Sequence, residues 1–280
     1  MTTSKIVENW MTQPVVSVDP YTRLDDAKQL MNTKSIRTLP VTNEGKLVGI
    51  VTRRDLLRYD PSAAMKSHWT EYSGLENETV DHIMSRKVTT IRSNATVGQA
   101  ARVMYENKFS GLPVTDTSRQ MIGIITSTDM FRFILENSDY VNSFYKTSSL
   151  MTSLVETIAP YETLFEAHRL MGIMRIRALP VVDDHETLVG IITRTDVLSA
   201  DPSAFMKNRQ DLSRKILSTP ISYIMTSKPI TINPDTPVST AAELMMTYKI
   251  HSLPVLNEEN RLAGIITDSD LFHMILQKFN

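Results

Sequence analysis

The chain has 280 residues, 41% of them hydrophobic and 22% charged, which is typical of a globular protein large enough for two domains. Its 30 basic and 31 acidic residues leave a formal charge of −1, without the basic surplus that is typical of nucleic-acid-binding proteins. The absence of cysteine excludes disulfides, thiolate metal sites and cysteine nucleophiles. No apolar run has the roughly 18 residues of a membrane span, and the first residues do not resemble a secretion signal, so we expect a cytoplasmic protein that does not enter a membrane.

Three short motifs recur four times in one order. Met-[Thr/Ser] comes first, Leu-Pro-Val follows, and Gly-Ile-[Ile/Val]-Thr comes last. The methionines are Met11, Met84, Met151 and Met225, and the prolines of Leu-Pro-Val are Pro40, Pro113, Pro180 and Pro254. Because each proline lies at one constant distance from its methionine, the chain contains four repeats. Asp-Pro-Ser-Ala follows only the first repeat (60–63) and the third (201–204), so the repeats form two matching pairs.

Each repeat predicts the same elements in chain order. A β-branched segment predicts a first strand, at 15–18, 88–91, 155–158 and 230–232. A threonine suited to cap a helix follows, namely Thr22, Thr96, Thr163 or Thr236, and apolar residues then recur with helical spacing. The Leu-Pro-Val strand, the Gly-Ile strand and a second helix complete a β-α-β-β-α unit. The fold class is therefore α/β (α+β by some schemes), and a unit this small should pair with its neighbour to cover its sheet.

These patterns place the repeats at 1–59, 79–136, 147–200 and 219–280, paired into modules 1–138 and 139–280. Residues 60–78 and 201–218 are predicted links within a pair, and residues 136–149 the link between pairs. The second helices carry more apolar residues than one core needs, so we expect the two modules to pack on each other or to pair with those of a second chain in a homodimer. These residues are Leu56, Leu57, Met130, Phe131, Phe133, Ile134, Leu271, Phe272, Met274 and Ile275.

This order of motifs resembles the CBS domain, named after cystathionine β-synthase, in four copies over nearly the whole chain. CBS domains pair into Bateman modules, and the chain resembles two of them in tandem. The resemblance implies a non-catalytic sensor that binds AMP, ADP, ATP or S-adenosylmethionine and regulates another protein. The alternative that remains open is an interaction scaffold with decayed pockets, which would hold a partner enzyme or transporter by its helical faces.

Each repeat has the sequence Thr-x-x-Asp where the second helix begins. The pairs are Thr52 and Asp55, Thr126 and Asp129, Thr193 and Asp196, and Thr267 and Asp270. One interpretation is a capping box, in which the threonine and the acid bond to each other's backbone. The other, implied by the resemblance, is that the carboxylate accepts hydrogen bonds from two ribose hydroxyls. All four copies use Asp where capping boxes favour Glu or Gln, and a helix N-terminus favours anions, so both interpretations stay open.

The resemblance also implies a phosphate site and an adenine slot. Phosphate contacts are expected from basic residues three positions before the motif proline or inside Thr-x-x-Asp, namely Arg37, Arg53, Arg177, Arg194 and His251. Ser110 interrupts this pattern in the second repeat. The adenine slot is expected to be lined by Val15, Val16, Ile36, Val88, Val155, Ile176, Ile230 and Ile250. The alternatives are solvated side chains for the basic residues and plain core positions for the apolar ones.

Other chemistry finds no support in the sequence. The six histidines lack metal-ligand spacing, and no nucleophile, Walker or Gly-x-Gly-x-x-Gly motif is present. We therefore expect no metal, no cofactor other than the adenosyl ligand, no catalytic residue and no enzymatic activity.

Overall fold

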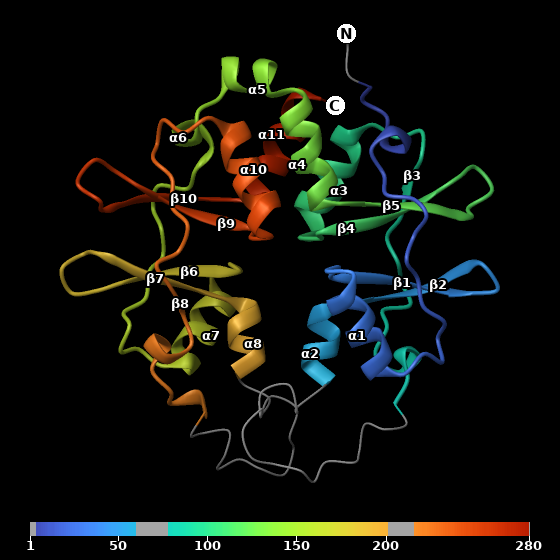
Figure 1. The fold of residues 1–280 in the computed structure, drawn as a ribbon, viewed down its shortest axis with the longest axis horizontal. Helices are drawn as coiled ribbons and strands as arrows, with labels where there is room; N and C mark the ends of the chain where they lie inside the picture. The colour runs from blue at the N-terminus through green and yellow to red at the C-terminus, as the bar shows by residue number, and fades with distance from the viewer. Residues whose placement is uncertain (1–3, 60–77, 201–215, 280) are drawn as a thin grey trace. The chain divides into compact units, whose positions relative to one another are not determined.

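The computed structural model describes residues 4–59, 78–200 and 216–279. They form two compact units, each built from repeats that are not neighbours in the sequence (Figure 1). Unit 1 comprises Met1–Val15, Thr89–Val155 and Pro229–Asn280, and so holds the second and fourth repeats. Unit 2 comprises Val16–Val88 and Glu156–Lys228, and so holds the first and third repeats.

In unit 2 both repeats follow the order helix, strand, strand, helix. The first repeat consists of α1 (Leu24–Thr33), β1 (Thr38–Asn43), β2 (Lys46–Thr52) and α2 (Arg53–Tyr59), and the third of α7 (Leu164–Ile173), β6 (Ala178–Val182), β7 (Leu188–Thr193) and α8 (Arg194–Ala200). Three short elements complete the unit: η3 (Val80–His82), η5 (Ile221–Tyr223) and β8 (Thr226–Ser227). Most of the predicted links at 60–78 and 201–218 lie outside the described residues.

Unit 1 repeats this order twice and adds two short helices. The second repeat consists of β3 (Ile91–Arg92), α3 (Val97–Asn107), β4 (Gly111–Thr115), β5 (Met121–Thr126) and α4 (Ser127–Glu136), and the fourth of α10 (Val238–Tyr248), β9 (Ser252–Leu256), β10 (Leu262–Thr267) and α11 (Asp268–Lys278). η1 (Val7–Asn9) precedes them in the chain, and α5 (Ser138–Phe144) and α6 (Thr147–Leu150) lie between the two repeats. The stretch predicted as a link at 136–149 is thus largely helical.

The two central strands of each repeat form an antiparallel hairpin, as predicted. The register is the same in all four, since the valine of Leu-Pro-Val always stands opposite the glycine of Gly-Ile. The prediction of a first strand over three or four residues is wrong. Only β3 and single parallel bridges form there, as between Val18 and Val41. Val18 exchanges two hydrogen bonds with β1, but the chain before it turns away to another repeat, so the ladder cannot extend.

Two of the four predicted helix caps are also wrong. Thr96 and Thr163 cap α3 and α7 as expected, but α1 and α10 are preceded by Arg23 and Pro237. The hydroxyls of Thr22 and Thr236 instead accept hydrogen bonds from Asp19 and Asn233 in tight turns just before those helices. Threonine serves local turns and caps equally well, so its presence does not fix where the helix begins.

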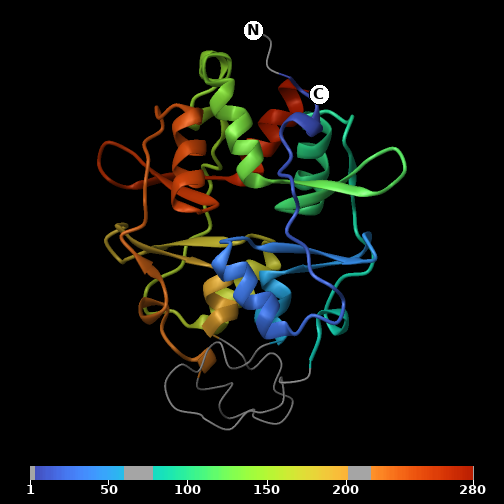
Figure 2. The ribbon, with the colours of Figure 1, turned by 45° about the vertical axis from the view of Figure 1, so that its right-hand side comes forward.

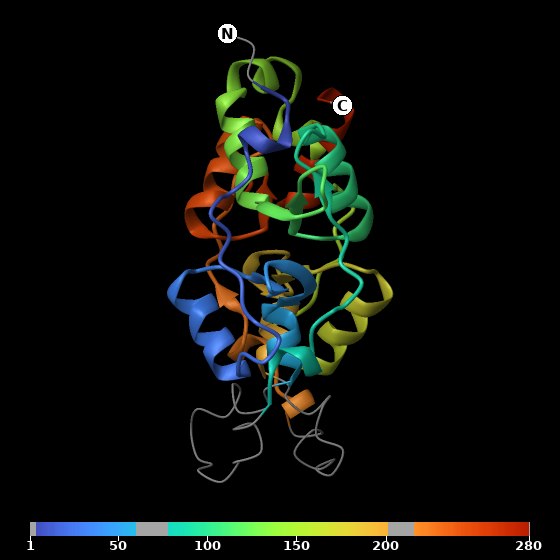
Figure 3. The same ribbon diagram turned by 90° about the vertical axis from the view of Figure 1, so that its right-hand side faces the viewer.

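The segment that leads into each repeat packs on the other repeat of its predicted pair. Residues 4–15, which can be followed from the N-terminus in Figure 3, lie in unit 1 against the second repeat. There the amide of Thr12 donates to Ile124 at 2.8 Å, and Met11 covers Gly123, where an added Cβ would lie 2.8 Å from Met11 Cγ. Met84 covers Gly49, Met151 covers Gly264 and Met225 covers Gly190 in the same manner. The first and third motifs of the sequence are therefore partners in space, with the glycine making room for the methionine.

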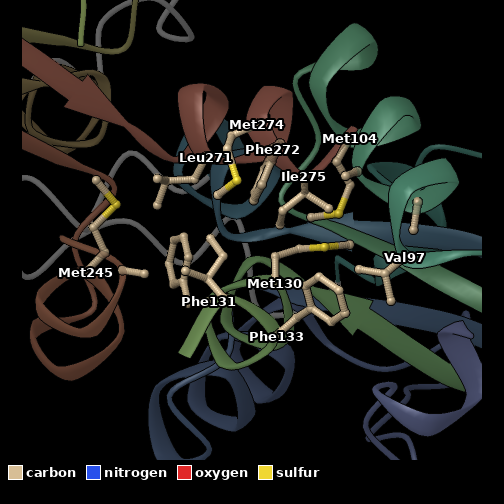
Figure 4. Close-up of a cluster of buried hydrophobic side chains, with 14 of the residues drawn as sticks. Val97, Met104, Met130, Phe131, Phe133, Met245, Leu271, Phe272, Met274 and Ile275 are labelled. Carbon is tan, nitrogen blue, oxygen red and sulfur yellow. The ribbon is translucent and has the colours of Figure 1, made fainter. Parts of the chain in front are cut away.

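The core of unit 1 joins the second and fourth repeats. α3 lies beside α11, and α10 lies beside α4 (Figures 1 and 2). The rings of Phe131 and Phe272 stack across this boundary with centroids 6.5 Å apart (Figure 4). The surplus apolar faces of α4 and α11 are thereby buried. Packing between modules and pairing with a second chain both stay predictions. In unit 2, α2 contacts α8, while the cores of the first and third repeats are separate clusters.

Within the described ranges, no helix has the length and apolar character needed to cross a membrane.

Candidate functional site

The threonine and aspartate of Thr-x-x-Asp have the same geometry in all four repeats. The threonine amide and hydroxyl both donate to one carboxylate oxygen, Oδ2. The amide and hydroxyl distances are 2.8 and 2.6 Å for Thr52 and Asp55, 2.8 and 2.8 Å for Thr126 and Asp129, 2.8 and 2.7 Å for Thr193 and Asp196, and 2.7 and 2.7 Å for Thr267 and Asp270. The capping interpretation is therefore correct, but the cap engages only Oδ2 of each carboxylate and leaves Oδ1 for other partners.

The other oxygen, Oδ1, distinguishes the second repeat from the rest. Asp129 is 3% exposed, and its Oδ1 accepts from the hydroxyl of Thr12 at 3.3 Å and from the guanidinium of Arg132 at 3.2 Å. Asp55, Asp196 and Asp270 are half-buried, and in the part of the chain that the structure describes no protein group donates to their Oδ1. Three repeats thus keep an acceptor that a ligand hydroxyl could use, whereas the protein itself occupies the acceptor in the second.

Burial shifts the pKa of two of these carboxyls. It raises the pKa of Asp129, against the hydrogen bonds from Thr126 and the charge of Arg132. It also raises the pKa of Asp270, and the neighbouring carboxylate of Asp268 raises it further.

A backbone hydrogen bond joins the two positions predicted to contact phosphate. In each repeat the residue after the motif threonine donates its amide to the carbonyl of the residue three positions before the motif proline. The bonds run from Arg53 to Arg37 (2.8 Å), from Ser127 to Ser110 (2.9 Å), from Arg194 to Arg177 (2.8 Å) and from Asp268 to His251 (3.0 Å). The two positions are therefore adjacent at the start of the second helix, beside the aspartate. This pairing follows from the hairpin register.

The side chains at these positions differ in what they do. The guanidinium of Arg194 donates to the carbonyls of Met171 (2.6 Å) and Ile176 (3.3 Å), and so binds the C-terminal end of α7. Arg37 and Arg53 are exposed and Arg177 is half-buried. Contact of these arginines with phosphate stays a prediction. In the fourth repeat, Nδ1 of His251 lies 3.0 Å from Oδ2 of Asp268, which is 1% exposed.

Comparison with known proteins identifies the repeats. The family model described as the CBS domain matches residues 7–62, 80–136, 148–203 and 221–277. The chain belongs to the CBS-domain family. The predicted boundaries of the repeats and their pairing into modules stay predictions.

Several known proteins resemble the chain over nearly its whole length. Protein MJ1225 of Methanocaldococcus jannaschii is 31% identical over 95% of this chain and 96% of its own. Its crystal structure, described as that of a candidate archaeal homologue of g-AMPK, matches with a TM-score of 0.74 over 96% of this chain and 99% of that one. A conserved protein of Pyrococcus horikoshii matches with a TM-score of 0.66 and 26% identity over 96% and 99% of the two chains. Inosine-5′-monophosphate dehydrogenase of Korarchaeum cryptofilum is 32% identical over 49% of this chain, which corresponds to 26% of that enzyme.

The residues predicted to line an adenine slot share one degree of burial in these CBS repeats. All eight (Val15, Val16, Ile36, Val88, Val155, Ile176, Ile230 and Ile250) are half-buried, neither enclosed in a core nor fully exposed. Val16, Ile36, Ile176, Ile230 and Ile250 pack with one side against the hydrophobic clusters. This placement suits the wall of a cleft, and the slot itself stays a prediction.

Sequence reasoning missed three residues that shape these CBS sites. Thr12 and Arg132 both donate hydrogen bonds to Oδ1 of Asp129, and the carboxylate of Asp268 lies against the ring of His251. Alignment of the four repeats shows Arg, Ser, Arg and Asp after the motif threonine, which could have singled out Asp268. Nothing local marks Thr12 as a partner of Asp129, because the two lie 117 residues apart. Among the described residues, no group of three or more His, Asp or Glu side chains could hold a metal ion.

Proposed function

We propose that the protein is a non-catalytic regulatory sensor of the cytoplasm that binds adenine nucleotides (AMP, ADP or ATP) or a related adenosyl ligand such as S-adenosylmethionine. The ligand binds beside the Thr-x-x-Asp motifs, and the bound state is read by a partner protein that the chain regulates.

The observation that carries this proposal is that only one carboxylate oxygen, Oδ2, of Asp55, Asp196 and Asp270 accepts hydrogen bonds from the threonine of its motif. The threonine fixes Oδ2, so the carboxyl group is held in one orientation before any ligand arrives. Oδ1 then offers lone pairs that can accept from neighbouring hydroxyls, as a ribose presents at its 2′ and 3′ positions. The backbone positions beside this acceptor hold Arg37 and Arg53 in the first repeat and Arg177 and Arg194 in the third, where the guanidinium of Arg194 already binds the end of α7. The fork of a guanidinium suits phosphate. A diol acceptor beside paired arginines favours a phosphorylated nucleoside.

The comparisons agree with a regulatory role. The match to inosine-5′-monophosphate dehydrogenase covers about a quarter of that enzyme, so a pair of such repeats there accompanies a larger catalytic chain. The relative from Methanocaldococcus jannaschii, of nearly the same length as this chain, is compared in its description with g-AMPK. Both support a sensor that acts on another protein.

Equilibrium dialysis tests the proposal. The protein is dialysed against AMP, ADP, ATP, adenosine and S-adenosylmethionine, with GMP as the control for the base. We expect saturable binding of at least one adenosyl ligand. Because hydrogen bonds to a charged acceptor are worth about 1.5–3 kcal/mol, the combined variant Asp55→Asn and Asp196→Asn should weaken nucleotide binding about ten- to a hundredfold. Failure to bind any member of the panel would overturn the proposal.

A scaffold remains the second candidate, favoured by two observations. The carboxylate of Asp129 is filled by protein groups, as expected of a decayed pocket. On α7, Phe165 and Ile173 are 54% and 64% exposed, whereas the matching positions of α1 hold the polar Asp25 and Thr33. An exposed apolar helix face of this kind could hold a partner protein. A negative dialysis panel would favour this candidate.

A further inference from the structure

The four CBS repeats carry different charges at one shared backbone position. The residue after the motif threonine always donates its amide to the residue three positions before the motif proline, so these two side chains start from equivalent places in every repeat. The first and third repeats have two arginines there, and the second has two serines. The fourth has His251 and Asp268. Relative to Arg194 in the third repeat, Asp268 reverses the sign of the charge.

Asp268 also lies against His251, the residue of these two positions in the fourth repeat that can carry a positive charge. Its Oδ2 lies 3.0 Å from Nδ1 of His251, and both atoms are shielded from solvent. A protonated His251 is therefore matched by a carboxylate inside the protein. Because the two opposite charges lie only 3.0 Å apart, they cancel, and the net charge that this pair presents to a ligand is close to zero.

A second acid, Asp270, stands beside this pair. Burial raises the pKa of Asp270, and the negative charge of Asp268, two residues before it, raises that pKa further. The charge of Lys108, at the end of α3, lowers that pKa. A phosphate placed beside Asp270 would meet that carboxylate and no net positive charge from the His251–Asp268 pair, whereas one beside Asp55 would have Arg37 and Arg53 at the corresponding positions.

We propose that the fourth repeat selects an adenosyl ligand whose 5′ substituent carries no negative charge, an uncharged nucleoside or one with a cationic substituent, and that Asp268 determines this selectivity. The inference rests on the proposed function, since it assumes that Asp270 binds a ribose. It assigns phosphorylated ligands to the first and third repeats. One chain would then sense two chemically distinct adenosyl pools at separate sites.

Adenosine and AMP test this assignment because they share the base and ribose and differ only in the phosphate. The combined variant Asp55→Asn and Asp196→Asn removes the ribose acceptors of the first and third repeats. Binding that survives in it and disappears on adding Asp270→Asn belongs to the fourth repeat. There we expect adenosine to bind about tenfold more tightly than AMP. In the same background, Asp268→Ser should tighten AMP about tenfold and change adenosine less than about twofold.

Serine is a suitable replacement because Ser127 fills this position in the second repeat and is itself buried. Glu258→Ser is the matched control, since it removes one negative charge from the exposed turn between β9 and β10. It should leave the ratio of AMP to adenosine affinity unchanged. If Asp268→Ser does not fold, the ring signals of His251 in the unmodified chain serve instead, and in NMR titrations they should shift at about tenfold lower concentrations of adenosine than of AMP.

Three results would overturn the inference while leaving the proposed function intact. The first is AMP binding at the fourth repeat as tightly as adenosine. The second is a ratio of AMP to adenosine affinity that Asp268→Ser does not change. The third is nucleotide binding by the unmodified chain combined with no adenosine binding in the double variant. Absence of all binding by the unmodified chain would instead overturn the proposed function itself.

Discussion

Thr152 and Ile265 exchange two backbone hydrogen bonds, of 2.9 and 3.0 Å, although they belong to the beginning of the third repeat and to a strand of the fourth. The exchange depends on Gly264, since a Cβ added there would lie 2.9 Å from the carbonyl oxygen of Thr152. The neighbouring Met151 fills the remaining space above the glycine. One glycine thus allows a segment of one repeat to complete the sheet of another.

Gly264→Ala should therefore destabilise the protein. The clash involves backbone, which cannot rotate away, so we expect the free energy of unfolding to fall by about 1–3 kcal/mol in urea titrations. Gly172→Ala is the control, because nothing lies within 4 Å of its added Cβ and Gly172 is an exposed residue of α7. Alanine there should raise the free energy of unfolding by about 0.5–1 kcal/mol. Equal stability of the two variants would contradict the close approach.

Asp196→Asn and Asp129→Asn should have opposite consequences. At Asp196 we expect nucleotide affinity to fall about tenfold or more, because asparagine has one acceptor oxygen where a ribose needs two. At Asp129 we expect no change in affinity, because Thr12 and Arg132 already occupy its second oxygen. Calorimetric titration and thermal melts of both variants give the two quantities. Loss of affinity in Asp129→Asn would show that the second repeat binds a ligand after all.

Replacing Arg37 and Arg177 together by alanine should lower the affinity for AMP far more than the affinity for adenosine. A charge-assisted contact is worth about 1.5–3 kcal/mol, which corresponds to about ten- to a hundredfold in affinity. Arg102→Ala, on the exposed side of α3, removes a positive charge elsewhere and should affect neither ligand. Equal weakening of AMP and adenosine would mean that Arg37 and Arg177 support the fold of the site and do not bind phosphate.

Phe272→Ala should test the core that joins the second and fourth repeats. Phe272 is 1% exposed and stacks on Phe131, so its loss leaves a cavity that should cost about 3–5 kcal/mol in the free energy of unfolding. Phe165→Ala, on the exposed face of α7, should change it by less than about 0.5 kcal/mol. Chemical denaturation of both variants makes the comparison. A small effect at Phe272 would show that the two repeats do not share a core.

The buried carboxyl of Asp129 should make the free energy of unfolding depend on pH. Burial raises its pKa above the ordinary value of 3.8, so the folded state holds this proton more tightly than the unfolded state. Its contribution to stability is full below pH 3.8 and declines as the pH rises through the folded pKa. The free energy of unfolding of the unmodified protein, minus that of Asp129→Asn, should accordingly fall as the pH is raised over this window. A difference that grows with pH would mean that Arg132 stabilises the carboxylate more than burial penalises it.

The sequence by itself determined the repeats and the local structure within them. Hairpins form where Leu-Pro-Val precedes Gly-Ile, and helices follow the apolar spacing, because strand and helix periodicity are local properties of the chain. The local pattern Thr-x-x-Asp likewise predicted correctly that Thr52 and Asp55 lie where a helix begins. Local sequence patterns misplaced the caps at Thr22 and Thr236, since a threonine can close a turn as readily as it caps a helix.

Only the tertiary structure decided which segments complete one another. Met11, in the segment that precedes the first repeat's helices, covers Gly123 in the second repeat, and the apolar faces of α4 and α11 cover each other. Burial depends on which surfaces meet and not on their distance along the chain. The same reason explains the sites. Four nearly identical Thr-x-x-Asp motifs differ in the side chains around them. Thr12 donates to Asp129 from 117 residues away, and the hairpin register sets Asp268 against His251.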